Sequence, residues 1–367
     1  MTQKKIPYEH NAGPIIMEPL LSVVMPVYNS YYYLPEAINS ILTQTFHKFE
    51  FIIINDASTD DSQKIIDEFA SLDTRIKVVI NKQNLGVAGS LNKGISLARS
   101  SLIVRMDSDD CSMPNRLHEL FEFMNANPEV VVCGSFMTIY ETGALCTRPV
   151  ENSYLHARLL FEVCFFHPTV IFRKPIIMEI AGGYSTDLAV EDYDLWVRLA
   201  DNKDIKFANI PLSLLRYRVH SGQVSFRNYD KVFEQSSIIK KKQLVNLGIH
   251  LNDKEFSTFI DLNYCKRPHS TKNFLECAKL VEMLLQSNGF TKVYSTTALK
   301  LTLMQYWQAY GYACSPVVLA NGILLVFIRT IFKFNFNTLY FRLAGISSLV
   351  LFKRVIGKIF RLLKISH

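Results

Sequence analysis

The sequence predicts an α/β fold in which a mostly parallel sheet is flanked by helices and followed by a helical extension. Three observations support this prediction. Short apolar runs alternate with helical patterns from residue 21 to residue 106, the pattern becomes mainly helical from residue 231, and the positive charge gathers near the C-terminus. Near-continuous Val and Ile runs are typical of parallel strands that are covered on both faces.

Four strands and three helices are expected in the first third of the chain. The strands are predicted at 21–28, 49–56, 76–80 and 101–106, and the helices at 33–45, 60–71 and 87–100. Right-handed crossovers place the carboxyl ends of such strands at one edge of the sheet. Ligands of open parallel sheets bind at that edge.

The pattern changes beyond residue 130. We expect a hairpin over 130–150, a helix near 153–162, a strand at 168–174, a break at Gly182-Gly183 and a helix at 191–201, with mainly helical structure over 231–310. The resulting division of the chain is a flexible N-terminal arm (1–18), an α/β domain (19–228), a helical region (229–316) and a basic amphipathic tail (317–367).

Composition and charge fit a globular protein whose two ends differ. Of the 367 residues, 49% are hydrophobic and 20% are charged, which is ordinary for a protein with a core. Residues 1–282 hold 30 basic and 33 acidic residues, whereas the last 85 hold ten basic residues and no acid. The seven cysteines are scattered without a CxxC pair, which favours reduced thiols in a cytosolic compartment.

Two predicted strands end in polar, acidic segments. Asn55-Asp56-Ala57-Ser58-Thr59-Asp60 follows the second strand, and Asp107-Ser108-Asp109-Asp110 follows the fourth. A single Asp or Ser in such a place is explained as a helix cap or turn. Three carboxylates within four residues repel each other, and a divalent cation would remove that cost. Oxygen ligands suit Mg²⁺ or Mn²⁺, which also bind substrate phosphates.

These segments resemble motifs of the family 2 glycosyltransferases, which have the GT-A fold. The resemblance covers roughly residues 20–225 and starts with three ordered blocks, 24–29, 55–60 and 105–110. Further segments similar to the family are Asn84-Leu85-Gly86, Leu91-Asn92-Lys93-Gly94, His167-Pro168-Thr169, Gly182-Gly183-Tyr184, the stretch 191–196 and Tyr217-Arg218-Val219-His220. The family usually has Asp-Asp at the end of the second strand, where this chain has Asn55-Asp56.

The resemblance implies roles for individual residues. Asp56 would meet the nucleotide base, Asp107 the ribose or a water beside the phosphates, and Asp109 the metal, with Asp107 also a candidate metal ligand. Asp192 would be the catalytic base and Glu191 its less certain partner. The remaining residues expected near the nucleotide-sugar are Pro26, Tyr28, Asn29, Asn84 and Asn92.

The implied reaction is an inverting, non-processive transfer of one hexosyl or N-acetylhexosaminyl unit from a nucleoside-diphosphate sugar, by default a UDP-sugar. The acceptor would be a glycan or a lipid-linked glycan in bacterial cell-surface polysaccharide synthesis, such as capsule or lipopolysaccharide. A bound Mn²⁺ or Mg²⁺ would stabilise the leaving diphosphate, and a carboxylate would take the proton of the acceptor hydroxyl.

Several candidate residues have a second interpretation. Glu191 and Asp192 begin a predicted helix, where acids are also favoured as caps. His167 is either a core residue or a neighbour of the diphosphate or acceptor, and His220 lies either in a solvated loop or against a phosphate or metal. Trp196 is expected in the core, with stacking on the acceptor as the alternative.

The C-terminal tail is apolar and basic. Its run at 317–328 has 12 residues, against the roughly 20 that a membrane span needs. Residues 349–364 predict an amphipathic helix with Lys and Arg on its polar face, which is typical of binding to an anionic membrane surface. The protein would then be cytoplasmic and peripheral at the inner face of the membrane. A core or partner helix is the alternative, and nucleic acid is disfavoured because the aromatic residues alternate with aliphatic ones.

Three other functions compete with this prediction. A processive polysaccharide synthase would carry a QxxRW segment and a series of long apolar spans, and neither is found in the sequence. A nucleotidylyltransferase would carry a glycine-rich basic loop where this chain has Pro26-Val27-Tyr28-Asn29. A catalytically silent nucleotide-sugar or glycan-binding protein at the membrane remains the alternative to the enzyme.

Overall fold

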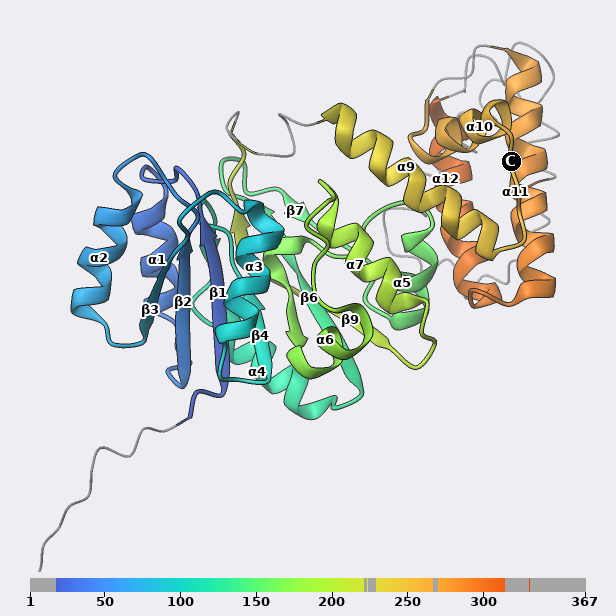
Figure 1. The fold of residues 1–367 in the computed structure, drawn as a ribbon. Coiled ribbons are helices and arrows are strands. Elements are labelled where there is room, and N and C mark those ends of the chain that lie inside the picture. Colours follow the sequence, from blue (N-terminus) through green and yellow to red (C-terminus); the bar gives the residue numbers. More distant parts are fainter. Residues whose placement is uncertain (1–17, 221–222, 224–228, 267–269, 314–329, 331–367) are drawn as a thin grey trace, which may run out of the picture.

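The structure is a computed structural model that describes residues 18–220, 223, 229–266, 270–313 and 330. These residues form a mixed sheet flanked by helices, and helices α9 to α12 lie at the end of the molecule opposite α1 and α2 (Figure 1). The predicted arm (1–18) and tail (317–367) fall outside the described residues, apart from Glu18 and Thr330. The membrane-associating role of the tail therefore stays a prediction.

The first half of the sheet is parallel, as predicted. Its strands lie side by side in the order β3-β2-β1-β4. Their bounds are β1 Leu21–Val27, β2 Phe49–Asn55, β3 Ile76–Ile80 and β4 Leu102–Arg105. The connecting helices are α1 Leu34–Leu42, α2 Ser62–Leu72 and α3 Gly86–Leu97. All seven elements were predicted from the sequence with ends within three residues of these bounds.

Both faces of β1, β2 and β4 are buried, whereas the edge strand β3 is partly exposed. In β1, Val23 and Met25 pack into the core beneath α1 and α2, whereas Val24 packs into the core beneath α3. This alternation explains why the strands read as continuous apolar runs. A Cβ atom added at Gly94 of α3 would lie 2.4 Å from Cγ1 of Val24, so glycine allows the close approach of helix and sheet at this point.

The second half of the sheet is mixed. β8 pairs antiparallel with β4 and β6, β9 runs parallel to β6, and short β5 and β7 pair with β9 and β6. The bounds are β5 Cys111–Ser112, β6 Val130–Ile139, β7 Leu145–Cys146, β8 Ile171–Arg173 and β9 Lys206–Tyr217. The expected hairpin is confirmed as β6 and β7. The strand predicted from residue 168 was wrong at its start, because His167–Thr169 form a short 3₁₀ helix (η1) around Pro168.

Helices complete the two layers that cover the sheet. The helix α4 (Arg116–Ala126), which the sequence analysis did not identify, packs with α1 and α2. On the other face lie α5 (Asn152–Leu159), α6 (Lys174–Ala181) and α7 (Glu191–Ala200) together with α3. Helix α6 ends at Gly182, whose φ of +66° is the left-handed conformation that glycine favours at a helix end. The break predicted at this glycine pair is confirmed.

The helical region predicted over 231–310 is confirmed. It consists of α9 (Tyr229–Asn246), α10 (Asp253–Asn263), α11 (Thr271–Thr291) and α12 (Thr296–Ala313). These helices share a core with Leu160 and Phe161, which follow α5, so the region is packed directly on the α/β part. None of the helices within the described residues is long and apolar enough to cross a membrane.

Candidate active site

A cleft of about 1180 Å³ opens at the carboxyl ends of the parallel strands. The chain passes from β1 to β2 and β3 on one side and returns to β4 on the other side, so β1 and β4 flank the point where the strand order reverses. This point is where open α/β sheets bind ligands. The loops after the two strands are joined by a 2.7 Å hydrogen bond between the hydroxyls of Ser30 and Ser108.

The nucleotide-side candidates line one end of this cleft. Pro26, Tyr28, Asn29, Asp56 and Asn84 all contribute to its wall. Asn29 adopts a left-handed backbone (φ +49°), and its side-chain oxygen accepts a 2.8 Å hydrogen bond from Thr59 N. Asn29 therefore also fixes the loop after β2.

Asp56 is buried at the end of β2 and holds the loop before α3. Its Oδ1 accepts hydrogen bonds from Asn81 Nδ2 (2.7 Å) and Leu85 N (2.8 Å). The side-chain oxygen of Asn84 accepts a 3.0 Å hydrogen bond from Gly86 N. Asp56 and Asn84 thus fix the shape of the wall that they line.

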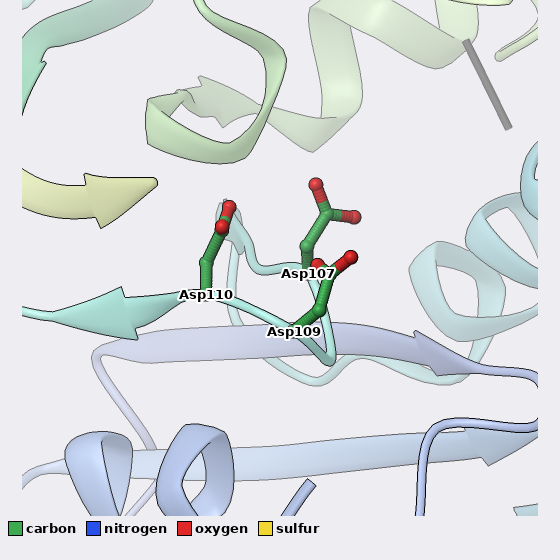
Figure 2. Close-up of side chains that lie close together, drawn as sticks. All are labelled: Asp107, Asp109 and Asp110. Carbon is green, nitrogen blue, oxygen red and sulfur yellow. The ribbon is translucent and has the colours of Figure 1, made fainter. Parts of the chain in front are cut away.

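Three carboxylates rise from the turn after β4 to the same side of the chain (Figure 2). Asp107, Asp109 and Asp110 each offer an oxygen within 4.8 Å of the others. Asp110 is fully buried, and its Oδ2 atom has no hydrogen-bond partner within the described residues. Burial raises the pKa of Asp107 and, together with the two neighbouring carboxylates, raises that of Asp110 well above its ordinary value.

This carboxylate cluster fits a divalent cation. The carboxylate oxygens are close enough to bind one ion together, and a set of oxygen ligands suits Mg²⁺ or Mn²⁺. The repulsion between the three carboxylates is only partly offset by a neighbouring positive charge. Arg105 forms an ion pair with Asp107 and offsets part of the negative charge. The orphaned Asp110 Oδ2 atom shows that the described residues alone do not satisfy the cluster.

The residues that follow β9 pack against the carboxylate cluster. His220 Nε2 lies 2.9 Å from Asp109 Oδ2, and its ring packs against Tyr33 at 4.8 Å between centroids. Arg218 donates from Nε to the backbone oxygen of Asp109 (2.9 Å), and its backbone N–H donates to Asp110 Oδ1 (2.9 Å). His220 therefore lies against a candidate metal ligand, and its contact with a phosphate or a metal stays a prediction.

Arg116, which the sequence analysis missed, connects the segments around the carboxylate cluster through hydrogen bonds. It is fully buried and donates to the backbone oxygens of Arg105 (2.6 Å) and Pro168 (2.7 Å) and to Ser112 Oγ (2.8 Å). Burial lowers the pKa of this guanidinium to about 9. No local motif could have identified it, because its partners come from three separate segments.

Glu191 and Asp192 line the same cleft at the first turn of α7. The N-cap residue is Val190, so neither acid is the N-cap, although both lie in the first turn, where the helix dipole favours acids. Burial, followed by the neighbouring Asp192, raises the pKa of Glu191 to about 7. Burial likewise raises the pKa of Asp192, although its Oδ1 accepts a 2.7 Å hydrogen bond from Tyr193 N. Raised carboxyl pKa values are a property of general bases.

The other candidates occupy different surroundings. His167 lines the cleft and bonds Tyr184 Oη at 3.0 Å, and burial holds its pKa well below the usual range. Trp196 is fully buried with Phe165 against its edge, so it lies in the core as first expected. Asn92 is not among the residues that line the cleft, because its amide pairs with the backbone N and O of Tyr184 at 2.9 and 2.8 Å.

The cleft continues from Asp192 to the helical region. This second part is lined by residues that the sequence analysis did not identify, among them Glu162, Lys240, Asn263, Tyr264 and Tyr306. They come from the segment after α5 and from α9, α10 and α12 or the residues next to them. One cleft therefore contains three parts: the carboxylate cluster that could bind a metal and a diphosphate, the carboxyl groups of Glu191 and Asp192, and a far end lined by polar and aromatic side chains.

Comparison with known proteins points to one family. The sequence model described as glycosyl transferase family 2 matches residues 22–180. The O-antigen biosynthesis glycosyltransferase WbnJ of Escherichia coli is 34% identical over 237 residues, which are 62% of this chain and 92% of that protein. A second Escherichia coli protein, the UDP-Glc:alpha-D-GlcNAc-diphosphoundecaprenol beta-1,3-glucosyltransferase WfaP, is 29% identical over 224 residues (60% and 86%).

The fold is also similar to that of solved structures. Residues 1–349 of S. aureus TarS, crystallised with UDP-GlcNAc, superpose with a TM-score of 0.55 at 17% sequence identity. The match covers 82% of this chain and 92% of that one. At this identity the likeness concerns the fold, and it confirms the expected sheet with flanking helices.

Proposed function

The chain belongs to family 2 of the glycosyltransferases, with a GT-A fold, and from this premise we propose an inverting, metal-dependent, non-processive sugar transfer. The donor would be a nucleoside-diphosphate sugar carrying a hexosyl or N-acetylhexosaminyl unit. One observation carries the proposal: the cluster of Asp107 and Asp109 and the carboxyl groups of Glu191 and Asp192 line one cleft.

The donor end would be organised by the loops after β1, β2 and β4. Tyr28, Asn29, Asp56 and Asn84 would enclose the nucleoside, because they form the wall of the cleft on that side. Asp107 and Asp109 would hold Mn²⁺ or Mg²⁺ beside the diphosphate. When bound, the cation would stabilise negative charge on the leaving nucleoside diphosphate. Arg105, buried beside Asp107, keeps that carboxylate in a fixed position through their ion pair.

The proton of the acceptor hydroxyl would pass to Asp192. Its pKa is raised by burial, so its carboxylate takes a proton more readily than an exposed one. Glu191 shares the pocket, and each charge raises the proton affinity of the other, so the two groups titrate as a pair. One displacement at the anomeric carbon with one base inverts the configuration of the sugar.

The relatives support a donor and an acceptor class for this proposal. WfaP is named for UDP-Glc and a diphosphoundecaprenol-linked acceptor, and WbnJ for O-antigen biosynthesis. We infer a UDP-sugar donor and a lipid-linked glycan acceptor in surface polysaccharide synthesis. Such an acceptor fits a peripheral position at the inner face of the membrane, with the basic tail at the anionic surface.

A donor screen tests the proposal. The purified protein is mixed with Mn²⁺ or Mg²⁺ and a panel of nucleotide-sugars, and the release of nucleoside diphosphate is followed with Asp109→Asn and Asp192→Asn as the matched variants. We expect release from one donor that needs the metal and falls by about 10²–10⁴-fold in Asp192→Asn. Donor binding without release, even with lipid extract, would instead support the silent binding protein.

A further inference from the structure

The far end of the cleft carries a buried positive charge. Lys240 lies in α9 on the same face as Ser236 and Gln243, and Lys240 and Ser236 line the cleft. Gln243 Nε2 donates a 3.2 Å hydrogen bond to Oη of Tyr193, which is the residue after Asp192. Gln235, the residue before Ser236, accepts a 2.6 Å hydrogen bond from Ala189 N. These contacts fix the face of α9 that bears Lys240 beside the segment that carries the proposed base.

The described partners of the Lys240 ammonium are neutral. Nζ lies 3.3 Å from Tyr264 Oη and 4.9 Å from the centroid of that ring. With its amide nitrogen directed to Phe161 O (2.8 Å), Asn263 presents its side-chain oxygen to Nζ at 3.2 Å. An ammonium has three N–H donors, so these two oxygens leave one donor for a ligand.

Lys240 has no carboxylate at ion-pair distance within residues 18–220, 223, 229–266 and 270–313. The nearby Glu162 is already paired with Arg148 (3.1 Å) and Arg158 (2.5 Å), and it accepts a 2.7 Å hydrogen bond from Tyr306 Oη. In the rest of the sequence the one acid is Glu9. Glu162 is thus already neutralised by two arginines among the described residues, and it does not serve as the counter-ion of Lys240.

A buried charge without a counter-ion is costly, and proteins normally pair it. Lys240 is 2% exposed, and burial lowers its pKa to about 8. A bound anion would stabilise the charged form and use the third N–H. Lys240 comes from α9 of the helical region, whereas the carboxylate cluster follows β4, so we take the anion of Lys240 to be a group other than the nucleotide diphosphate.

We propose that Lys240, framed by Tyr264 and Asn263, binds an anionic group of the acceptor and makes the enzyme selective for negatively charged acceptors. This inference rests on the proposed function, because it takes the far end of the cleft as the acceptor side. The anion is a phosphate or a carboxylate that lies next to the acceptor sugar. Tyr264, which is 43% exposed, offers an aromatic face to that sugar.

Binding of three probes with the same octyl chain tests the proposal. The probes are N-acetylglucosamine joined to octanol through a diphosphate, octyl glucuronide and neutral octyl N-acetylglucosaminide. Calorimetry is performed on the full chain with Mn²⁺ and UDP in excess, so that the carboxylate cluster cannot capture the probe. We expect at least one anionic probe to bind about tenfold or more tightly than the neutral one, as a charge-assisted hydrogen bond implies, and the preferred anion identifies its source.

Two lysine variants give the matched comparison. Lys240→Met should bind the three probes with affinities within about twofold of one another. Lys242→Met should keep the wild-type preference, because Lys242 lies on the same helix with its side chain 61% exposed. Equal binding of all probes by the wild type, or an unchanged preference in Lys240→Met, would overturn the proposal. The wild-type comparison decides the matter alone if Lys240→Met does not fold.

The same titrations separate the two proposals. Failure of the wild type to bind UDP with Mn²⁺ would contradict the proposed donor site, whereas the preference among the three probes would still decide the role of Lys240. Normal binding of UDP with Mn²⁺ and no preference for anions would reject the role of Lys240 alone.

Discussion

Arg218 connects the carboxylate cluster to the rest of the fold, and its replacement should weaken metal binding without removing a metal ligand. Its Nε atom donates to Asp109 O at 2.9 Å, and its Nη2 atom pairs with Glu36 Oε2 at 2.6 Å. The guanidinium also lies over the rings of Tyr140 (4.0 Å) and Tyr33 (4.7 Å). Arg218→Met removes these interactions and keeps the backbone hydrogen bond to Asp110.

Arg218→Met should lower the metal affinity more than the stability of the fold. The hydrogen bond to Asp109, the partly exposed ion pair and the ring contacts together stabilise the fold by about 2–4 kcal/mol, and packing of the Met side chain restores part of this. Loss of a group that orients a metal ligand typically lowers metal affinity by about 10–100-fold. We therefore expect a moderate loss of stability with a disproportionate rise in the Mn²⁺ concentration that supports donor binding.

Titration of donor-saturated protein with Mn²⁺ measures this effect, and thermal unfolding measures stability. Glu36→Gln is the matched control, because it breaks the ion pair on the outer side and leaves the hydrogen bond to Asp109 in place. It should bind Mn²⁺ like the wild type. An unchanged Mn²⁺ affinity in Arg218→Met at a temperature where the variant is folded would refute the reasoning.

Three further predictions follow from burial and packing. kcat/KM should fall as the pH is lowered through about 7, because burial raises the pKa of Glu191 to that value and the pair with Asp192 must lose a proton; a flat profile down to pH 5 would contradict this. Trp196→Ala should cost about 3–5 kcal/mol of unfolding free energy in urea, and a loss below 1 kcal/mol would place Trp196 outside the core. Gly94→Ala should cost about 1–3 kcal/mol in the same assay, since its Cβ would lie 2.4 Å from Val24 Cγ1; a gain in stability would show that the helix can move away.

The parallel half of the fold was predictable largely because β1, β2 and β4 are buried on both faces. The runs at 21–28 and 49–56 consist largely of apolar residues, and the helices between them are amphipathic. The later strands give weaker signals. β8 has three residues, and β9 contains Pro211 and pairs with β6 through register shifts. Local sequence patterns do not encode such irregular pairing, because it depends on partners distant in the chain.

The candidate site was predictable where its residues cluster in the sequence. The acids at 107–110 and 191–192 are recognisable in the sequence, because neighbouring acidic residues stand together at the start of a predicted loop or helix. Arg116 and Lys240 carry no such signal, because their importance arises from burial and from partners in other segments. Asn92 shows the converse: it lies in a motif typical of the family, yet its amide is used by the backbone of Tyr184.

Asp109 and Asp192 have separate proposed roles: Asp109 binds the metal that holds the donor, and Asp192 accepts the proton of the acceptor hydroxyl. The deciding measurement is calorimetric binding of the donor selected by the screen, in the presence of Mn²⁺, to the wild type, Asp109→Asn and Asp192→Asn. We predict that Asp109→Asn loses metal-dependent binding, whereas Asp192→Asn binds the donor like the wild type and fails to transfer the sugar. Normal metal-dependent binding by Asp109→Asn, or full transfer by Asp192→Asn, would contradict the account.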